Sequence, residues 1–245
     1  MGEAGIQALL FDLDNTLIDT SGASRRAERQ VKDLLKSQYG YEESAANLII
    51  EKFNAKLQME NFDCVTGVKI DEERVLHFEA ALQETNGLNA DHDLATKCYF
   101  LWKTTRLQHI RISEEVKSML KTLRQSYKLL LLTNGSSKVQ REKINVCDCQ
   151  QYFDTIVVGG EQQEQKPALS IFQKCFQLLG VKPEACMMIG DNPETDIKGG
   201  VNAGVRTTVW INNTNLECEA GAMPDYTVKS VLQVLDILGK NSSKV

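Results

Sequence analysis

The order of apolar and polar positions divides the chain into a part where strands alternate with helices and an interrupting part that is helical throughout. Residues 8–11 form a short apolar run, which predicts a strand buried on both faces, and Asp12 follows directly. From about residue 21 to residue 108 the apolar positions follow helical spacing. The helices predicted in this stretch lie near residues 24–38, 42–59, 72–86 and 91–107.

Behind this insert, apolar runs and helical stretches alternate. Strands are predicted at residues 129–132, 155–158, 186–189, 207–211 and 226–228, and helices near residues 114–126, 137–146, 168–180, 195–203 and 230–238. This alternation is typical of right-handed βαβ units that build a parallel sheet. We therefore expect an α/β fold with a Rossmann-like core of residues 1–20 and 110–245, an inserted all-helical domain of residues 21–109, and a frayed tail from residue 239.

Composition narrows the partners that the protein is expected to have. The net charge of −5, with both signs mixed along the chain, gives no basic field to hold nucleic acid. No apolar run reaches the roughly 18 residues that a membrane helix needs, and the first residues do not resemble a signal segment. Seven scattered cysteines without a CxxC spacing indicate reduced thiols, so we expect a cytoplasmic protein. Cys147 and Cys149 are interpreted as small, partly buried side chains rather than a redox pair, because nothing basic is expected around them.

Two fragments at strand ends carry candidate chemistry. Residues 12–16 read DLDNT and place the carboxylates of Asp12 and Asp14 two positions apart at the end of a buried strand. Such carboxylates repel each other unless a cation or a shared proton offsets their charge. Residues 133–135 read TNG and end another buried strand in a hydroxyl, an amide and a glycine whose backbone can approach an anion closely. The two fragments predict a cation site and a phosphate cradle.

Two further fragments add charge of both signs. Lys166 precedes a proline and a predicted helix start, where an ammonium group and a helix amino terminus both favour an anion. Residues 190–196 end a strand in Asp191 and add Asp196, and such oxygen ligands suit Mg²⁺. Each fragment alone is typical of an ordinary turn or helix start. Because open α/β sheets bind ligands at the carboxyl ends of their strands, we expect all four fragments to meet in one crevice.

The four fragments resemble, in the same order, the motifs of the haloacid dehalogenase superfamily of phosphotransferases. The helical insert between the first and second fragments resembles the C1 cap of that family, while residues 133–166 leave no room for a C2 cap. The resemblance implies a Mg²⁺-dependent phosphatase that forms an aspartyl-phosphate and acts on a small sugar phosphate.

Residue roles follow from this resemblance position by position. It implies that Asp12 is the nucleophile and Asp14 the general acid and base, and that Thr133 and Lys166 assist catalysis. The residues expected to contact the phosphoryl group are Asp12, Leu13, Asp14, Asn15, Thr133, Asn134 and Lys166. Mg²⁺ would be held by the Asp12 side chain, the Asp14 backbone carbonyl and Asp191, with Asp196 orienting these groups.

Longer stretches narrow the resemblance to a branch of the superfamily that removes phosphate from a sialic acid 9-phosphate in sialic acid biosynthesis. These stretches are residues 11–20, 99–103, 105–109 and 157–162. Such a substrate carries a carboxylate as well as a phosphate, so cations of the insert are expected to contact it. The candidates are Arg25, Arg26, Lys103 and Arg106, and for each the alternative is a solvated surface charge.

Three alternatives stay open at this point. A hydrolytic dehalogenase shares the fold but does not need Asp14. A mutase, or a phosphatase for another small sugar phosphate or phosphoglycolate, would keep every residue of the four fragments. An interaction module built on an inactive core would be expected to have lost Asp12, Asp14, Lys166 or Asp191, and all four are present.

Overall fold

The computed structural model describes residues 5–60, 69–87, 91–213 and 223–242. The chain divides into two compact units, which we call the core unit, residues 1–19 and 111–245, and the cap unit, residues 20–110. Their roles as catalytic core and substrate-reading cap stay predictions. No helix within the described residues is long and apolar enough to cross a membrane.

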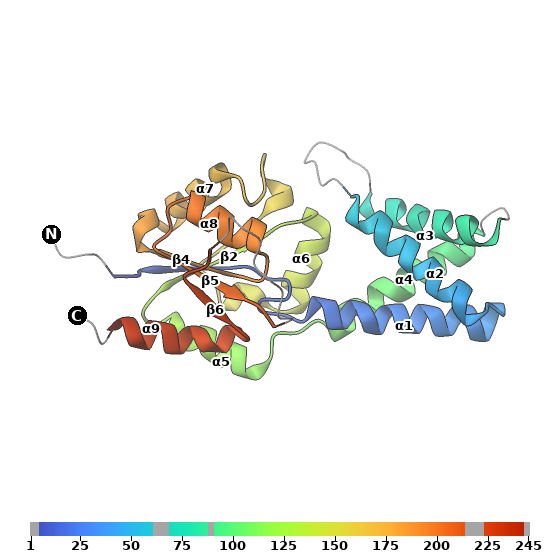
Figure 1. The fold of residues 1–245 in the computed structure, drawn as a ribbon, viewed down its shortest axis with the longest axis horizontal. Helices are drawn as coiled ribbons and strands as arrows, with labels where there is room; N and C mark the ends of the chain where they lie inside the picture. Colours follow the sequence, from blue (N-terminus) through green and yellow to red (C-terminus); the bar gives the residue numbers. More distant parts are fainter. Residues whose placement is uncertain (1–4, 61–68, 88–90, 214–222, 243–245) are drawn as a thin grey trace. The chain divides into compact units, whose positions relative to one another are not determined.

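The core unit is built on a sheet, of which Figure 1 labels β2, β4, β5 and β6. Its described strands all run parallel, in the order β3-β2-β1-β4-β5-β6. The strands are β1 (Ala8–Phe11), β2 (Lys128–Thr133), β3 (Thr155–Val158), β4 (Cys186–Gly190), β5 (Thr207–Ile211) and β6 (Tyr226–Val228). All four residues of β1 are fully buried, as expected of a central strand covered on both faces. The predicted α/β fold with a parallel sheet is confirmed, and β1 lies at its centre between β2 and β4.

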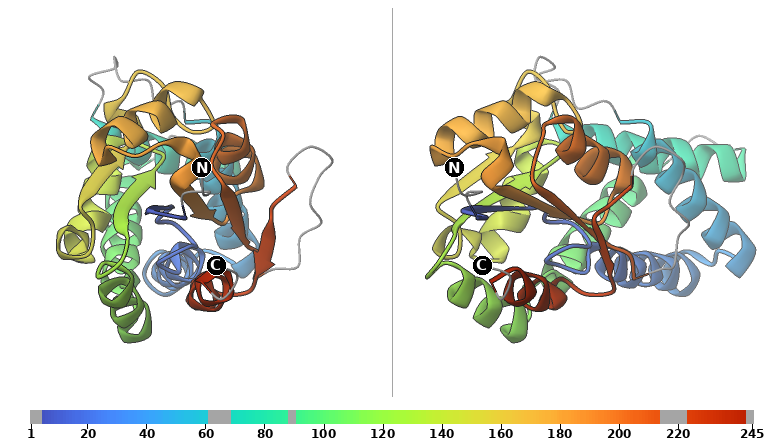
Figure 2. Two further views of the ribbon diagram at one scale, coloured as in Figure 1. Left: turned by 90° about the vertical axis from the view of Figure 1, so that its left-hand side faces the viewer. Right: turned by 60° about the vertical axis from the view of Figure 1, so that its left-hand side comes forward.

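Helices cover both faces of this sheet. They are α5 (Glu114–Leu123), α6 (Ser137–Val146), α7 (Leu169–Leu179), α8 (Lys198–Asn202) and α9 (Val234–Ser242). Figures 1 and 2 show α7 and α8 on one face of the sheet and α5 and α9 on the other. On the α7 face, the strand residues Leu10, Leu130 and Met188 join Phe172 and Phe176 in one buried cluster. This cluster holds the strands, and with them their carboxyl ends, against α7.

The cap unit has a hydrophobic core of its own. Its helices are α1 (Thr20–Tyr39), α2 (Glu43–Gln58), α3 (Ile70–Asn86) and α4 (His92–His109). On α1 the buried residues Ala27, Val31 and Leu35 recur once per turn, which gives the helix one apolar face. Between α2 and α3 the Phe53 ring stacks on Phe78 with the ring centroids 3.7 Å apart. The predicted helical insert is thus a compact bundle with its own packed centre.

Two predictions near the carboxyl terminus are wrong. The helix predicted at 195–203 is divided, because Pro193–Ile197 forms a π-helical turn and α8 begins at Lys198. The side chain of Asn192 starts this turn by accepting hydrogen bonds from two backbone N–H groups. The frayed tail is also wrong for Gly239–Ser242, which continues α9 because Ile237 and Leu238 anchor its preceding turn in the core. Residues 243–245 lie outside the described part.

Candidate active site

The side chains of Asp12 and Lys166 form the buried centre of the site. Asp12 follows β1, and its N–H donates to the Ile189 carbonyl of β4 at 2.9 Å, which fixes it at the carboxyl edge of the sheet. The Lys166 ammonium group donates three hydrogen bonds. Its acceptors are Asp12 Oδ1 at 2.8 Å, Leu132 O at 2.8 Å and Asp196 Oδ1 at 2.7 Å. Both side chains are more than nine-tenths buried, so each relies on the other for its polar contacts.

Burial and charge act on this pair in opposite directions. Burial raises the pKa of the Asp12 carboxyl, because a carboxylate loses its hydration in the interior, and the Lys166 ammonium group opposes that change. Burial also disfavours the charge of Lys166, but the carboxylates of Asp12 and Asp196 outweigh it and raise the pKa of Lys166. Lys166 is therefore cationic at neutral pH and suited to an anionic substrate group.

Asp191 and Asp196 complete an acidic cluster with Asp12, in which one carboxylate oxygen from each residue lies within 4.8 Å of the other two. Asp196 is fully buried, and its Oδ2 accepts from the N–H of Asn192 at 3.0 Å. Gly190 leaves the space for this carboxylate, because a Cβ at Gly190 would lie 2.1 Å from Asp196 Oδ2. Burial, with the nearby charge of Asp196, raises the pKa of Asp191 to about 7.

The acidic cluster fits a hard divalent cation. The Lys166 ammonium group contacts two of its three carboxylates, those of Asp12 and Asp196, so with all three ionised the cluster would hold an excess of negative charge in a buried place. Carboxylate oxygens are the ligands that Mg²⁺ prefers. Both carboxylate oxygens of Asp196 already accept hydrogen bonds, from Lys166 and from Asn192. Its part as an orienting residue, and those of Asp12, Asp14 and Asp191 as metal ligands, stay predictions.

Asp14 has polar partners of its own on α6. Lys143 Nζ donates to both carboxylate oxygens of Asp14 at 2.7 Å, and Gln140 Nε2 donates to Oδ2 at 3.0 Å. Lys143 and Gln140 are almost fully buried, while the Asp14 side chain keeps 28% of its surface exposed. Neither α6 residue could be identified from the sequence, because the packing decides which polar side chains of a helix are buried.

The loop after Asp12 places the remaining residues of the first fragment. Leu13 is fully buried, and its carbonyl accepts from the N–H of Leu17 at 3.0 Å. Asn15 adopts the left-handed backbone conformation with φ of 55°, which asparagine tolerates better than most residues. A hydrogen bond from the Asn15 side chain partly offsets the raised pKa of Asp191. Contacts of Leu13 and Asn15 with a phosphoryl group stay predictions.

The second and third fragments are tied together by Asn134. Its Oδ1 accepts from the N–H of Lys166 at 3.0 Å, and its Nδ2 donates to the Lys166 carbonyl at 2.8 Å. The N–H of Gly135 donates to Gln165 Oε1 at 2.7 Å, in a conformation with φ of 110° that favours glycine. Thr133 ends β2 and accepts a hydrogen bond from Gln140. The side chain of Asn134 thus supports Lys166, and its predicted contact with phosphate stays a prediction.

The four candidate cations of the cap unit differ in their surroundings. Arg25 and Arg26 are exposed on α1. Lys103 Nζ lies 2.9 Å from Asp71 Oδ1, and the Lys103 side chain is only 16% exposed. Arg106 donates to Ser24 Oγ at 3.0 Å and lies over the Trp102 ring. Lys103 and Arg106 are therefore not the solvated surface charges that the alternative interpretation expected, and a contact of any of the four with substrate stays a prediction.

The thiols Cys147 and Cys149 at the end of α6 correct one expectation. Both are buried, more completely than the partly buried side chains that we expected, and both are free thiols, as are Cys98, Cys175 and Cys186 among the described residues. A hydrogen bond with Cys149 lowers the pKa of Cys147 despite burial, and the charge of Lys143 contributes in the same direction. The expectation that nothing basic lies near this pair is wrong, because Lys143 is one helical turn away. Cys64 and Cys218 lie outside the described residues.

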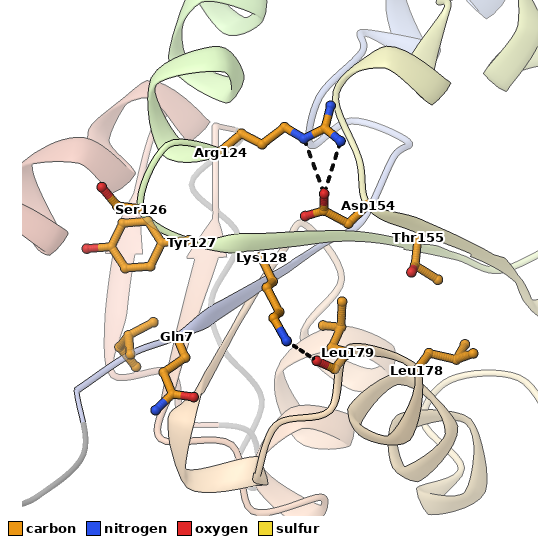
Figure 3. A pocket seen from close by; sticks show the side chains of 10 residues that line it. Gln7, Arg124, Ser126, Tyr127, Lys128, Asp154, Thr155, Leu178 and Leu179 are labelled. Atoms are coloured by element: carbon orange, nitrogen blue, oxygen red, sulfur yellow. Dashed lines mark hydrogen bonds and ion pairs between the residues drawn. The ribbon is translucent and has the colours of Figure 1, made fainter.

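A separate hollow of about 650 Å³ lies at the amino ends of β2 and β3, and Figure 3 shows the residues that line it. Arg124 Nη2 lies 3.0 Å from Asp154 Oδ1, and Lys128 Nζ donates to Leu179 O at 2.6 Å. Its two basic side chains are thus bound to neighbouring protein groups. None of the predicted site residues lines this hollow.

Known proteins of similar sequence and structure include phosphatases and other hydrolases. A family model for haloacid dehalogenase-like hydrolases matches residues 6–204. The chain is 51% identical to the N-acylneuraminate-9-phosphatase of Homo sapiens and 52% identical to that of Rattus norvegicus, and each match covers the whole chain and 98% of the relative. Among solved structures, the HAD-hydrolase YfnB of Bacillus subtilis, described as bound to magnesium, is similar with a TM-score of 0.70 at 23% identity, over 96% of this chain and 99% of that one.

Proposed function

The chain belongs to the haloacid dehalogenase-like hydrolase family, and on that premise we propose that it releases phosphate from N-acylneuraminate 9-phosphate, a step of sialic acid biosynthesis. The observation that carries this proposal is the full-length likeness to the human and rat enzymes of that name. The likeness includes the cap unit, where specificity for the sugar is expected to lie. The buried pair of Asp12 and Lys166 supports the proposal, because it would provide a carboxylate nucleophile beside a cation.

In this proposal two chemical steps use the two carboxylates of the first fragment. In the first step an Asp12 oxygen attacks phosphorus, the bond from phosphorus to the sugar oxygen breaks, and that oxygen takes a proton from Asp14. In the second step Asp14 takes a proton from a water molecule whose oxygen attacks phosphorus, and the bond to Asp12 breaks. The products are the free sialic acid, phosphate and the unchanged enzyme.

The groups around Asp12 support both steps. In the proposal Lys166 and the Thr133 hydroxyl would stabilise negative charge on the phosphoryl oxygens. This is supported by Asn134, which holds the backbone of Lys166. Mg²⁺ is the proposed cofactor, held by the carboxylates of Asp12 and Asp191 and by the Asp14 carbonyl. When bound, it would reduce the repulsion between Asp12 and the phosphate.

The sugar end of the substrate is assigned to the cap unit. We expect Arg25 and Arg26 to contact the carboxylate of the sialic acid, since both are exposed, while Lys103 and Arg106 already bind groups within the cap unit. A cytoplasmic location is part of the proposal, supported by five described cysteines that are free thiols.

The decisive test is phosphate release from a panel of substrates with Mg²⁺ and with EDTA. The panel contains N-acetylneuraminate 9-phosphate, hexose 6-phosphates, phosphoglycolate and an aryl phosphate. We expect Mg²⁺-dependent release, with kcat/KM for the sialic acid phosphate at least about 100-fold above the others. Release without that preference would contradict the assigned substrate, an isomerised product would indicate a mutase, and no release from any of them would favour an interaction module.

Substitution of the nucleophile tests the assignment of Asp12. Asp12→Asn keeps the shape of the side chain but removes the attacking carboxylate, so kcat is expected to fall at least about 1,000-fold while the fold remains. Phosphate release and circular dichroism measure the two effects. Turnover near that of the wild type would contradict the assignment.

A further inference from the structure

Helix α6 carries two polar side chains that are buried although neither belongs to the four fragments. Gln140 and Lys143 lie three positions apart, on one face of the helix, and are only 2% and 3% exposed. Burying a lysine ammonium group is costly unless it is paired and hydrogen-bonded. The partners of these two side chains therefore show what they are placed to do.

Both side chains converge on the Asp14 carboxylate. Lys143 Nζ lies 2.7 Å from each of its oxygens, and Gln140 Nε2 adds a hydrogen bond of 3.0 Å to Oδ2. Gln140 Nε2 also donates to Thr133 Oγ1 at the end of β2. One helix thus connects the proposed acid and base of the first fragment with the hydroxyl of the second.

The two buried lysines of the site, Lys143 and Lys166, form hydrogen bonds with different carboxylates. Lys166 binds Asp12 and Asp196, whereas Lys143 binds Asp14. Sequence positions 14 and 143 are brought together only by the sheet, since β1 and β2 are neighbours and α6 follows β2. The carboxylate that is assigned to proton transfer is therefore held from outside the four fragments.

We propose that Lys143 and Gln140 are positioning residues for Asp14, which fix its carboxyl group for proton transfer to the leaving oxygen. The proposal rests on the proposed function in one respect, the role of Asp14 as acid and base. As Asp14 gives up its proton to the sugar oxygen, negative charge develops on its two oxygens, and Lys143 and Gln140 already donate hydrogen bonds there. They thus act on the reaction through Asp14 and touch no substrate atom.

Two classes of substrate separate this role from a merely structural one. An alkyl phosphate has a poor leaving group that needs a proton, whereas p-nitrophenolate leaves without one. In Lys143→Met we expect kcat/KM for N-acetylneuraminate 9-phosphate to fall about 100-fold and kcat/KM for p-nitrophenyl phosphate to fall less than about threefold. The quantity compared is the ratio of kcat/KM for N-acetylneuraminate 9-phosphate to kcat/KM for p-nitrophenyl phosphate. Gln140→Met should lower this ratio by about tenfold, less than Lys143→Met does, because it removes one hydrogen-bond donor and leaves the positive charge of Lys143 in place. The ratio is measured on one preparation, so it does not depend on the fraction that is folded.

Two further variants complete the test. Lys128→Met removes a lysine at the amino end of β2, where its ammonium group donates to the Leu179 carbonyl, and this variant should leave the ratio unchanged. In an Asp14→Asn background, Lys143→Met should change kcat/KM for N-acetylneuraminate 9-phosphate less than about threefold. A residue that acts through Asp14 has no effect once Asp14 can no longer transfer a proton.

Equal losses on both substrates in Lys143→Met and Gln140→Met would overturn the proposal, as would no loss on either. If the wild type hydrolyses another alkyl phosphate in place of the sialic acid phosphate, the assigned substrate fails, and the same ratio measured with that alkyl phosphate still decides the role of Lys143 and Gln140. A wild type that hydrolyses neither class would overturn both proposals.

Discussion

At the scale of a single residue, Gly190 shows how little space the acidic cluster leaves. A Cβ at this position would lie 2.1 Å from Asp196 Oδ2 and 2.6 Å from Asp196 Cβ, so the aspartate would have to move away from Lys166 and Asn192. We expect Gly190→Ala to lower kcat/KM at least about 100-fold and stability by about 2–4 kcal/mol. Phosphate release and urea unfolding measure these effects. The control is Gly5→Ala, where a Cβ meets nothing within 4 Å, and equal losses in both variants would contradict the argument.

Asp191 makes the stability of the metal-free protein depend on pH. Its pKa is about 7 in the fold, against an ordinary value of 3.8, so the folded state retains a proton that the unfolded chain releases. The contribution of Asp191 to stability is therefore fully present at low pH and is lost as pH rises from about 4 to about 7. Asp191→Asn cannot ionise, so in EDTA at pH 8 it should be about 1–3 kcal/mol more stable than the wild type, with little difference near pH 4.

Urea unfolding of both proteins across this pH range measures the effect. In the presence of Mg²⁺ the order should reverse, because an ion that binds only the folded wild type stabilises it by mass action. A difference between the two proteins that is the same at every pH would speak against the raised pKa.

At the scale of elements, the short turn after β3 supports the start of α6. The N–H of Gly160 donates to the Gly135 carbonyl at 3.0 Å, and a Cβ at Gly160 would lie 2.4 Å from that carbonyl oxygen and 2.8 Å from Ser137 N. These are backbone atoms, which cannot move aside as a flexible side chain can. The turn and the beginning of α6 are thus packed too closely for any residue larger than glycine.

Gly160→Ala is therefore expected to displace the beginning of α6 and with it Gln140 and Lys143. Stability should fall by about 1–3 kcal/mol, and kcat/KM should fall more for an alkyl phosphate than for an aryl phosphate. Thermal unfolding and the two kinetic assays test this. Gly239→Ala is the matched control, because its Cβ meets nothing within 4 Å in α9, and it should be neutral or stabilising by up to about 1 kcal/mol. Equal effects of the two variants would contradict the role of the turn.

At the scale of the whole molecule, the core unit and the cap unit are packed around separate hydrophobic clusters. The chain has two tryptophans, and each unit holds one, Trp102 in the cap unit and Trp210 in the core unit. Phe53 packs edge-on against Trp102 with ring centroids 5.3 Å apart. Fluorescence of single-tryptophan variants can therefore follow the unfolding of each unit.

Phe53→Ala should destabilise the cap unit by about 3–5 kcal/mol, because it leaves a cavity in a closed cluster. In a Trp210→Phe background, Trp102 fluorescence reports the unfolding of the cap unit, and its midpoint should move to a lower urea concentration. In a Trp102→Phe background, Trp210 fluorescence reports the core unit, and its midpoint should move much less. An equal shift of both transitions would mean that the two units unfold as one.

The order of the elements and the positions of the four fragments can be predicted from the sequence alone. Apolar periodicity is a local property, so it predicted the buried β1, the helical insert and the alternating strands, and the carboxyl end of each strand followed from these. The expectation that Asp12, Asp14 and Asp191 lie at one edge needed only the rule that ligands of open α/β sheets bind at the carboxyl ends of the parallel strands. Lys166 was assigned to the same place by the helix start that it precedes. The π-helical turn at Pro193–Ile197 was missed because its sequence reads as an ordinary helix start.

Which polar side chains are buried, and which groups they contact, became evident only from the folded protein. Lys143 and Asp14 are 129 positions apart, and Lys166 and Asp12 are 154 apart, so local sequence carries no record of either pair. The same holds for the cap cations, of which Lys103 and Arg106 bind neighbours and Arg25 and Arg26 face solvent. The physical reason is that the cost of burying a charge depends on its partners, and those partners are supplied by the packing of distant elements.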